Sequence, residues 1–587
     1  MINSLRKIWS FLTKPERKNA VGLLGFMLLG TVLETLSVGF VIPAMMLLTQ
    51  EDLTERYPRS QPILSFLGNP SQAHLIWAGM LALVGIYVAK TLFLAFLSWR
   101  QTRFAFGVQA QLSQRLFEVY LRQPYTFHLQ RNSAHLIRNA ISEVNQFTFN
   151  GMLPGMLIFT ESLVLLGLGS LLLIVEPLGA LILGGVFSVS AWSFQRATGA
   201  GISRFGQLRL HHEGLRLQHL QQGLGGAKDV ILLGREEEFQ AQYREHNLRS
   251  ARASEFLVTL QQLPRLWLEL LAVVGLAGLV LIMLAQGSNM NSIVPTLALF
   301  GAAAFRLMPS ANRMLGSVQT LQYCSPVIEL ISNELVLPVV EPLAPGAGFT
   351  KEAATAIRLS DVSYTYPMTA TPTLTDITLS IERGEYVGLI GPSGSGKSTL
   401  VDLLLGLLPA TSGQVTVNGR DIREDVRSWQ RQIGYVPQNI FLTDDTLRRN
   451  VAFGLANNRI DHAAVVRAIS AAQLEEFVAG LTDGLETVVG ERGVRLSGGQ
   501  RQRIGIARAL YHDPAILVMD EASSALDSVT EAGVMDAVSA MQGSKTILIV
   551  AHRNSTVERC EKVFRLKRGR LVGEGSPSEM LQSRTRV

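Results

Sequence analysis

Long apolar runs are the feature that most constrains what this chain can fold into. They fill roughly the first 320 of its 587 residues. A helix of about 20 apolar residues is long enough to cross the hydrocarbon core of a membrane. Most of the runs reach that length, and we expect six membrane helices: roughly Ala20–Leu48, His74–Ser98, Phe149–Val175, Leu178–Ser193, Leu266–Gln286 and Ile293–Met308.

Short polar breaks and charge indicate how these helices are threaded. Only Glu176 and Pro177 separate the third span from the fourth, and 287–292 separates the fifth from the sixth, so both breaks are predicted to be tight external turns. The N-terminus and the segments after spans two and four are rich in lysine and arginine, whereas the loops on the other side hold only Arg56 and Arg59. The positive-inside rule therefore places the N-terminus, both long loops and the C-terminal half in the cytoplasm.

The long cytoplasmic loops carry apolar residues at helical spacing. Each of 99–148 and 194–264 is predicted to be two helices that continue out of the bilayer. The turns are expected near Pro124–Phe127 and Gly223–Gly226. Leu5–Leu12 is predicted to be an amphipathic helix at the interface, with no cleavable signal peptide before it.

Composition excludes some classes of protein. Two cysteines, Cys324 and Cys560, lie far apart, which excludes a disulfide framework and clusters of the CxxC type. The net charge of +6 would suit a nucleic-acid partner. Cytoplasmic lysines and arginines on a membrane protein account for the same charge, so we expect no nucleic acid.

After Pro338 the sequence changes to that of a soluble α/β protein. We expect a transmembrane domain over 1–335, a Pro- and Gly-rich linker over 336–355 and a nucleotide-binding domain over 356–587. Strands are predicted in "IRLSDVSYTYP", "LTDITLSI" and "YVGLI". The last strand leads into "GPSGSGKST", which fits the phosphate loop GxxxxGK[ST], and then into a predicted helix.

The phosphate loop predicts contacts with ATP and Mg²⁺. Its glycines let backbone N–H groups surround phosphate oxygens at a helix N-terminus. Lys397 can reach the β- and γ-phosphates, and Ser398 can bind Mg²⁺. The residues expected to contact ATP here are Gly391, Ser393, Gly394, Gly396, Lys397, Ser398 and Thr399.

Two further motifs complete the expected site. "ILVMDE" reads as a buried strand that ends in Asp520, suited to hold Mg²⁺, and Glu521, suited to polarise the attacking water. "LSGGQ" places Ser497, Gly498, Gly499 and Gln500 at the start of a helix, which makes a second anion-binding surface.

The ordered motifs resemble the nucleotide-binding domain of ATP-binding cassette (ABC) transporters. On that resemblance the chain is a membrane protein of the ABC exporter type, with six transmembrane helices and long cytoplasmic extensions fused to an α/β P-loop domain. The resemblance implies ATP and Mg²⁺ as ligands, and importers, which typically have separate membrane subunits, are set aside. It assigns these roles: catalysis to Glu521, His552 and Gln438, adenine stacking to Tyr366, Mg²⁺ binding to Ser398, Gln438 and Asp520, contact with a partner subunit to Asp527, and contact with the membrane helices to Gly490–Gly493.

One chain carries six spans and one cassette, so we expect a homodimer. The resemblance implies that LSGGQ of one copy faces the ATP of the other. The expected location is a bacterial inner membrane, with the cassette in the cytoplasm. A rival reading is an ABC ATPase that opens a pore or regulates a partner, but Glu521 and His552 are both in place for hydrolysis.

Arg306 and Arg313 raise the question of cargo. They stand seven residues apart, on one face of the sixth span, where a charge should face a wet cavity or a partner. Arg306 could instead pair with Glu34 or Glu269, Arg313 could snorkel to the boundary, and the roles of Lys90 and Glu161 stay open.

The functional reading is recognition of an anion, since a guanidinium group matches phosphate geometry. "FRLMPSANR" and "LETLSVGFVIPAMMLL" resemble stretches of bacterial flippases that move lipid-linked oligosaccharide for protein N-glycosylation. The resemblance implies a polyprenyl pyrophosphate glycan as cargo, drawn from membrane lipid. The alternative is a general exporter of lipid A-like lipids or drugs.

Overall fold

The computed structural model describes residues 2–40, 72–175, 177–285, 290–338, 348–349, 356–521, 528–551 and 553–582. The chain divides into two compact units. We call Met1–Gln123 with Arg131–Val339 the membrane unit, and Pro124–Gln130 with Val340–Val587 the cassette unit. Most of the expected linker lies outside the described residues, so its boundaries stay a prediction.

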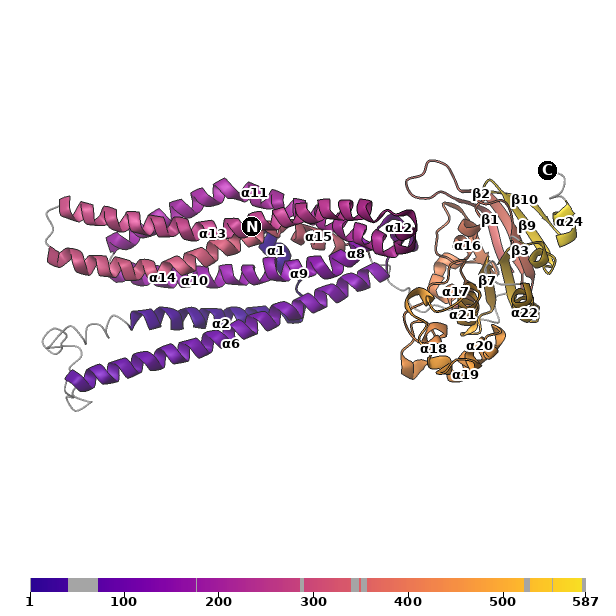
Figure 1. Ribbon diagram of the computed structural model, residues 1–587, viewed down its shortest axis with the longest axis horizontal. Coiled ribbons are helices and arrows are strands. Elements are labelled where there is room, and N and C mark those ends of the chain that lie inside the picture. The colour runs from indigo at the N-terminus through magenta and orange to yellow at the C-terminus, as the bar shows by residue number, and fades with distance from the viewer. Residues whose placement is uncertain are drawn as a thin grey trace. The chain divides into compact units, whose positions relative to one another are not determined.

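Six long helices build the membrane unit, one for each predicted span (Figure 1). A helix of 50 residues is about 75 Å long, which is more than twice the thickness of the hydrocarbon core, so much of its length extends into water as the sequence predicted. The six are α2 Lys14–Gly39, α6 Gln72–Leu121, α10 Leu153–Val175, α11 Pro177–Gly225, α13 Glu236–Ala285 and α14 Met290–Tyr323.

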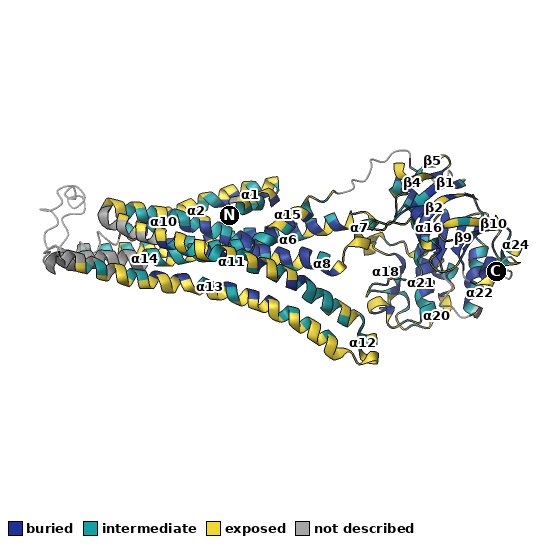
Figure 2. Ribbon diagram, turned by 90° about the horizontal axis from the view of Figure 1, so that it is seen from above, coloured by how far each residue is buried: buried dark blue, intermediate teal, exposed yellow. Residues whose placement is uncertain are grey.

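The apolar character of these helices fits a membrane. Within the described part of the chain, four helical stretches are long and apolar enough to cross one: Lys14–Ser37, Ile76–Leu121, Ser133–Leu171 and Glu236–Gly275. On α6 the exposed side chains Trp77, Leu81, Val84, Val88 and Leu92 recur at helical spacing. Figure 2 shows exposed residues along the long helices, as expected of surfaces that face lipid.

The two predicted cytoplasmic turns are present, but each contains a short helix: α7 Tyr125–Gln130 and α12 Ala227–Leu233. Gly234 ends α12 in the left-handed conformation, at φ 61°. The predicted amphipathic N-terminal helix is α1 Ile2–Phe11, and α15 Ser325–Leu335 follows the sixth long helix.

The helix that leads into span three differs from the regular helix that the sequence predicted. Two π-helical segments, η2 Asn139–Glu143 and η3 Thr148–Met152, flank the single turn α9 Val144–Phe147. Before them lies α8 Ser133–Arg138, whose N-terminus is capped by the side chain of Asn132. A π turn is wider than an α turn; such turns are rare and are frequently found at functional sites.

The cassette unit contains two sheets. The larger has the order β10-β9-β3-β8-β7-β6, with β10 antiparallel to β9 and the other neighbours parallel. The smaller is antiparallel, in the order β2-β1-β4-β5. The strands are β1 Ala356–Tyr364, β2 Leu374–Glu382, β3 Tyr386–Ile390, β4 Ser412–Val417, β5 Arg420–Asp421, β6 Ile433–Val436, β7 Ile516–Asp520, β8 Thr546–Val550, β9 Lys562–Lys567 and β10 Arg570–Gly575.

Central strands β3, β7 and β8 are buried at every position, which explains why their sequences are apolar except for Asp520 and Thr546 at strand ends. Figure 2 shows dark blue, buried residues within the cassette unit. Around the sheets lie α16 Lys397–Leu404, α17 Val426–Gln430, α18 Leu447–Val451, α19 His462–Ala471, α20 Glu475–Ala479, α21 Gly498–Leu510, α22 Ser528–Ser539, α23 Asn554–Val557 and α24 Pro577–Gln582.

Candidate functional site

The phosphate loop joins β3 to α16, as the sequence predicted. Gly391 has φ 155°, and a Cβ atom there would stand 2.2 Å from the carbonyl oxygen of Leu566. Gly394 has φ 74° and open space where a Cβ would be, so its requirement is conformational. The loop therefore keeps one glycine for close packing and another for a backbone turn that faces open space.

Lys397 lies at the start of α16 and is buried. Its ammonium group donates hydrogen bonds to the carbonyl oxygens of Gly391 at 3.0 Å and Pro392 at 3.1 Å. Burial lowers the pKa of Lys397, while the nearby charges of Glu521 and Asp520 act in the opposite direction. The carbonyl oxygens of the loop thus accept hydrogen bonds from the Lys397 ammonium group, which lies near two carboxylates.

Asp520 and Glu521 stand at the carboxyl end of β7, next to the phosphate loop. Asp520 is buried. Glu521 adopts φ 50°, which is uncommon for a residue other than glycine and often marks a functional position. The side-chain amide of Gln438 donates a hydrogen bond to the Glu521 carboxylate at 2.7 Å. The structure therefore brings together three residues that the sequence assigned to catalysis or Mg²⁺.

The donor set near Lys397 fits Mg²⁺. Ser398, Gln438 and Asp520 offer a hydroxyl, an amide oxygen and a carboxylate, and Mg²⁺ prefers such oxygen ligands. Gln438 and Asp520 are linked to the phosphate loop through Glu521 and Lys397. These residues could hold Mg²⁺ against a bound triphosphate.

The residues of the signature LSGGQ stabilise the start of α21. Ser497 caps α21, since its hydroxyl accepts a hydrogen bond from the backbone N–H of Gln500 at 3.2 Å. The Gln500 side chain in turn accepts one from the Ser497 N–H at 2.8 Å. This capping box fixes the first turn of α21, while Gly498 and Gly499 add no side chain over its N-terminus. Ser497 is exposed at this helix start, where the sequence predicts a surface for an anion.

Tyr366 follows the first strand of the smaller sheet. Its hydroxyl lies 3.1 Å from the hydroxyl of Thr399 on α16, and its ring meets that of Tyr364 edge to face. The aromatic residue predicted to stack on adenine is therefore next to the phosphate-loop helix.

Some of the predicted residues cannot be placed. Asp527 and His552 lie outside the described residues, and so does the side chain of Arg306, although its backbone belongs to α14. Gly490–Gly493 is described: Gly490, Arg492 and Gly493 all have positive φ values, which give the segment a sharp bend before the signature.

Arg313 has a partner that the sequence did not assign. Its guanidinium group donates to both carboxylate oxygens of Glu161 on α10, at 2.5 and 3.2 Å, and to the Ser310 hydroxyl at 3.2 Å. The Glu161 side chain is 6% exposed and that of Arg313 is 47% exposed. A forked ion pair therefore holds Arg313 by one side and leaves the other side open.

Two residues of the cassette were missed by sequence reasoning. Gln502, two residues after the signature, is buried and donates a hydrogen bond to the backbone oxygen of Glu521 at 3.2 Å. Asp402 on α16 has its pKa raised to about 6, first by burial and then by the charge of Asp520. Each lies on a helix within three residues of the end of a known motif, which is the signal that could have found it.

The cassette unit also includes α7 of the first cytoplasmic turn. Burial raises the pKa of Tyr125, and the negative charge of Asp402 raises it further, so the phenol lies near the phosphate-loop helix. The short helix is therefore next to the candidate site.

Comparison with known proteins matches both parts of the chain. The model of the family described as "ABC transporter" matches residues 374–524, and the model described as "ABC transporter transmembrane region" matches residues 60–282. A protein of Cupriavidus metallidurans named ATP-dependent lipid A-core flippase is 30% identical over 99% of this chain and 94% of its own length. A protein of the same name from Ralstonia nicotianae is 31% identical over 86% of this chain and 85% of its own length.

A solved structure supports the same fold. A bacterial Atm1-family ABC exporter with ATP bound superposes with a TM-score of 0.80 over 97% of this chain and 96% of that chain, at 23% sequence identity. The predicted fold class, with a helical transmembrane part and an α/β cassette, is confirmed. The relatives named here are lipid A-core flippases, so the expected likeness to the oligosaccharide flippase of N-glycosylation is supported only at the level of an ABC exporter.

Proposed function

Since the chain belongs to the ABC transporter family, whose ATP hydrolysis drives transport, we propose that two copies of it move an anionic glycolipid across a bacterial inner membrane. The observation that carries this proposal is the likeness, over 99% of the chain, to a protein named for moving lipid A-core. Each copy contributes six long helices and one cassette.

The phosphate loop would hold the triphosphate. Lys397 would exchange its hydrogen bonds to Gly391 and Pro392 for bonds to phosphate oxygens, which carry more charge than carbonyl oxygens. The first N–H groups of α16 would add to this attraction. Tyr366, next to Thr399, would lie along the adenine.

Hydrolysis would depend on the carboxyl end of β7. Glu521 would orient the attacking water and accept its proton, and Gln438 would hold the Glu521 carboxylate through their 2.7 Å hydrogen bond. Ser398, Gln438 and Asp520 would hold Mg²⁺, which neutralises charge on the phosphates when it is bound. By resemblance to the family, His552 would contact the γ-phosphate.

The signature would complete the site of the other copy. Ser497 is exposed and Gly498 and Gly499 are half-buried at the start of α21, where they would bind an anion, and phosphate of the bound ATP is such an anion. Gln502 links α21 to Glu521 of the same chain through a hydrogen bond. When the signature of one copy closes on the ATP of the other copy, the resulting shift of α21 would therefore change the position of Glu521, which acts on its own chain's ATP. Asp527 is proposed to lie at the same contact.

Movement of the cassette would reach the membrane through α7. This helix belongs to the cassette unit, although its sequence neighbours on both sides belong to the membrane unit. A shift of α16 on closure would therefore displace α7 and, through the chain, the end of α6.

For the cargo, the full-length relatives favour a lipid A-type glycolipid. A second candidate is a polyprenyl pyrophosphate glycan, which the two arginines of α14 favour. Both cargoes carry phosphate and sugar. In each case Arg306 and the open side of Arg313 would contact phosphate as the cargo enters from the inner leaflet.

Reconstituted, ATP-dependent translocation in proteoliposomes tests the proposal. We expect transport of a fluorescent lipid A derivative, and a fluorescent undecaprenyl pyrophosphate disaccharide tests the second candidate. Arg306→Ala should reduce translocation about tenfold or more while ATP turnover without cargo is kept. Transport of uncharged amphiphiles at the same rate, unaffected by Arg306→Ala, would instead support a multidrug exporter.

A further inference from the structure

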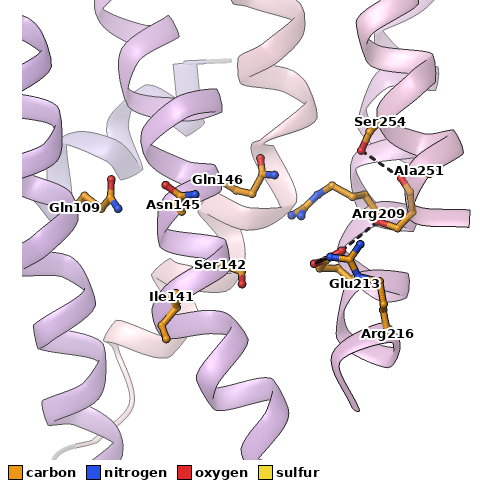
Figure 3. A pocket seen from close by; sticks show the side chains of 11 residues that line it. Gln109, Ile141, Ser142, Asn145, Gln146, Arg209, Glu213, Arg216, Ala251 and Ser254 are labelled. Carbon is orange, nitrogen blue, oxygen red and sulfur yellow. Dashed lines mark hydrogen bonds and ion pairs between the residues drawn. The ribbon is translucent and has the colours of Figure 1, made fainter. Parts of the chain in front are cut away.

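A polar cavity of about 600 Å³ opens in the membrane unit between α6, α9, α11 and α13 (Figure 3). We propose that this cavity binds the saccharide part of the cargo. The inference rests on the glycolipid function proposed above and names the residues that would hold the sugar: Gln109, Ser142, Asn145, Gln146, Ser250 and Ser254. Its volume falls within the range of about 300–1,000 Å³ that is typical of small-molecule sites.

The lining has the chemistry of a sugar site. Carboxamides come from α6 and α9, and hydroxyls come from η2 and α13. Amide and hydroxyl groups both donate and accept hydrogen bonds, as sugar hydroxyls do. In Figure 3 the side chains of Gln146 and Arg209 approach the space between their helices from opposite sides.

The charges around the cavity are already paired. Arg209 forms an ion pair with the buried Glu143 at 2.5 Å, and Arg216 with Glu213 at 2.5 Å. Arg216 also donates to the side chain of Asn247 at 3.1 Å. A phosphate would have to compete with the carboxylates of these pairs, and breaking the buried Arg209–Glu143 pair is strongly unfavourable. A neutral polyhydroxyl ligand can bind without breaking them, so the cavity favours sugar over phosphate.

The backbone and an unmet acceptor also mark the cavity. Its α9 wall lies between two π-helical segments, which are frequent at functional sites. The side-chain oxygen of Gln109 is buried and accepts no hydrogen bond from the described part of the chain. A donor from a bound ligand would satisfy this oxygen, which otherwise costs free energy.

An exposed aromatic pair borders the same surface. The rings of Phe106 and Phe149 meet edge to face with centroids 5.6 Å apart. Phe106 stands three residues before Gln109, and Phe149 four residues after Asn145, so each ring shares a helix face with a carboxamide of the cavity. Apolar ring faces beside a few polar groups are typical of small-ligand sites.

Binding of soluble sugars to the full-length homodimer in phosphatidylcholine nanodiscs tests the proposal. The probes are triacetylchitotriose, maltotriose and sodium phosphate, measured by saturation-transfer NMR. We expect at least one sugar to bind in the millimolar range. The double variant Gln109→Leu/Asn145→Leu should raise its Kd at least tenfold. Gln207→Leu, on the exposed face of α11, is the matched control and should change the Kd less than twofold.

The inference is overturned if neither sugar binds, if the double variant binds as well as the control, or if phosphate binds and displaces the sugar. Should the double variant fail to elute as a dimer, Ser142→Ala takes its place, with an expected threefold rise in Kd. Sugar binding without glycolipid transport would contradict the proposed function but support the saccharide site. Transport without sugar binding would remove this inference alone.

Discussion

The candidate ATP site of the cassette unit and the helices of the membrane unit use charge in different ways. In the cassette, Lys397 lies near Asp520 and Glu521, and all three belong to motifs for which the expected partner is a ligand. In the membrane unit, charges pair with each other across long stretches of sequence. Glu161 and Arg313 are 152 residues apart, and Glu143 and Arg209 are 66 residues apart.

The difference teaches where function can be read from sequence. A ligand that binds a contiguous loop imposes a recognisable pattern on that loop. An ion pair between two long helices imposes no pattern on either sequence segment, because the fold alone decides which two charges meet. Substitutions in the two units should therefore have different consequences.

Glu521→Gln should have the largest effect on turnover. A general base typically contributes about 10²–10⁴-fold, so ATPase activity should fall by that factor, while ATP still binds. Phosphate release from the homodimer measures the change. Glu558→Gln, an exposed carboxylate of the same cassette, is the control and should leave activity intact. If the Glu521→Gln variant keeps its ATP turnover, Glu521 is not the general base.

Glu143→Gln should have the largest effect on the stability of the membrane unit. It leaves the buried Arg209 without its 2.5 Å partner, and breaking a buried pair costs about 3–5 kcal/mol. Glu329→Gln breaks the more exposed 2.9 Å pair with Lys7 and should cost about 0–1 kcal/mol. Thermal unfolding of both variants in nanodiscs tests the contrast, and equal shifts would contradict it.

Two substitutions of Ser497 distinguish its role as the cap of α21 from its role in binding ATP. Ser497→Ala removes the cap of α21, which typically costs about 1 kcal/mol, and should also slow ATP turnover. Ser497→Asp restores a good cap but places a negative charge against phosphate. We therefore expect recovery of the thermal midpoint without recovery of turnover. Recovery of both would show that the hydroxyl acts only as a cap.

Asp402 should give a smaller, pH-dependent effect. Its folded pKa of about 6 lies above its ordinary value of 3.8, so ionisation destabilises the fold as pH rises from 3.8 to 6. Asp402→Asn should raise the free energy of unfolding at pH 7.5, and with it the thermal midpoint. The gain should be no more than about 1 kcal/mol because solvent screens part of the effect.

The gain from Asp402→Asn should shrink as the pH falls from 6 toward 4. Asp483→Asn, an exposed position of the same cassette, is its control and should show no such dependence. A gain that is constant over this range would contradict the raised pKa.

Local patterns predicted much of the fold. The apolar runs, the strands and the phosphate loop were all found from short segments, because each depends on its own periodicity or spacing. The short helices α7 and α12 and the two π segments were not predicted. The two π segments contain buried residues and pack against α6 and α14, which lie far away in the sequence. The helices α7 and α12 bury no residue, so no apolar pattern marks them.

The candidate site shows the same limit. Its motifs identified Lys397, Asp520 and Glu521, but Gln502 and Asp402 gained their roles only from the fold. Short stretches around Arg306 pointed to an oligosaccharide flippase, whereas the full-length relatives named here are lipid A-core flippases. A few residues on one helix say less about cargo than the whole chain does.

Disulfide cross-linking tests most directly whether two copies share each ATP. The native Cys324 and Cys560 are buried, so cysteines placed by Ser393→Cys and Ser497→Cys would be the exposed pair. With ATP and an oxidant, the doubly substituted chain should form a covalent dimer, and neither single variant should. If only monomers form at every ATP concentration, the shared site is contradicted.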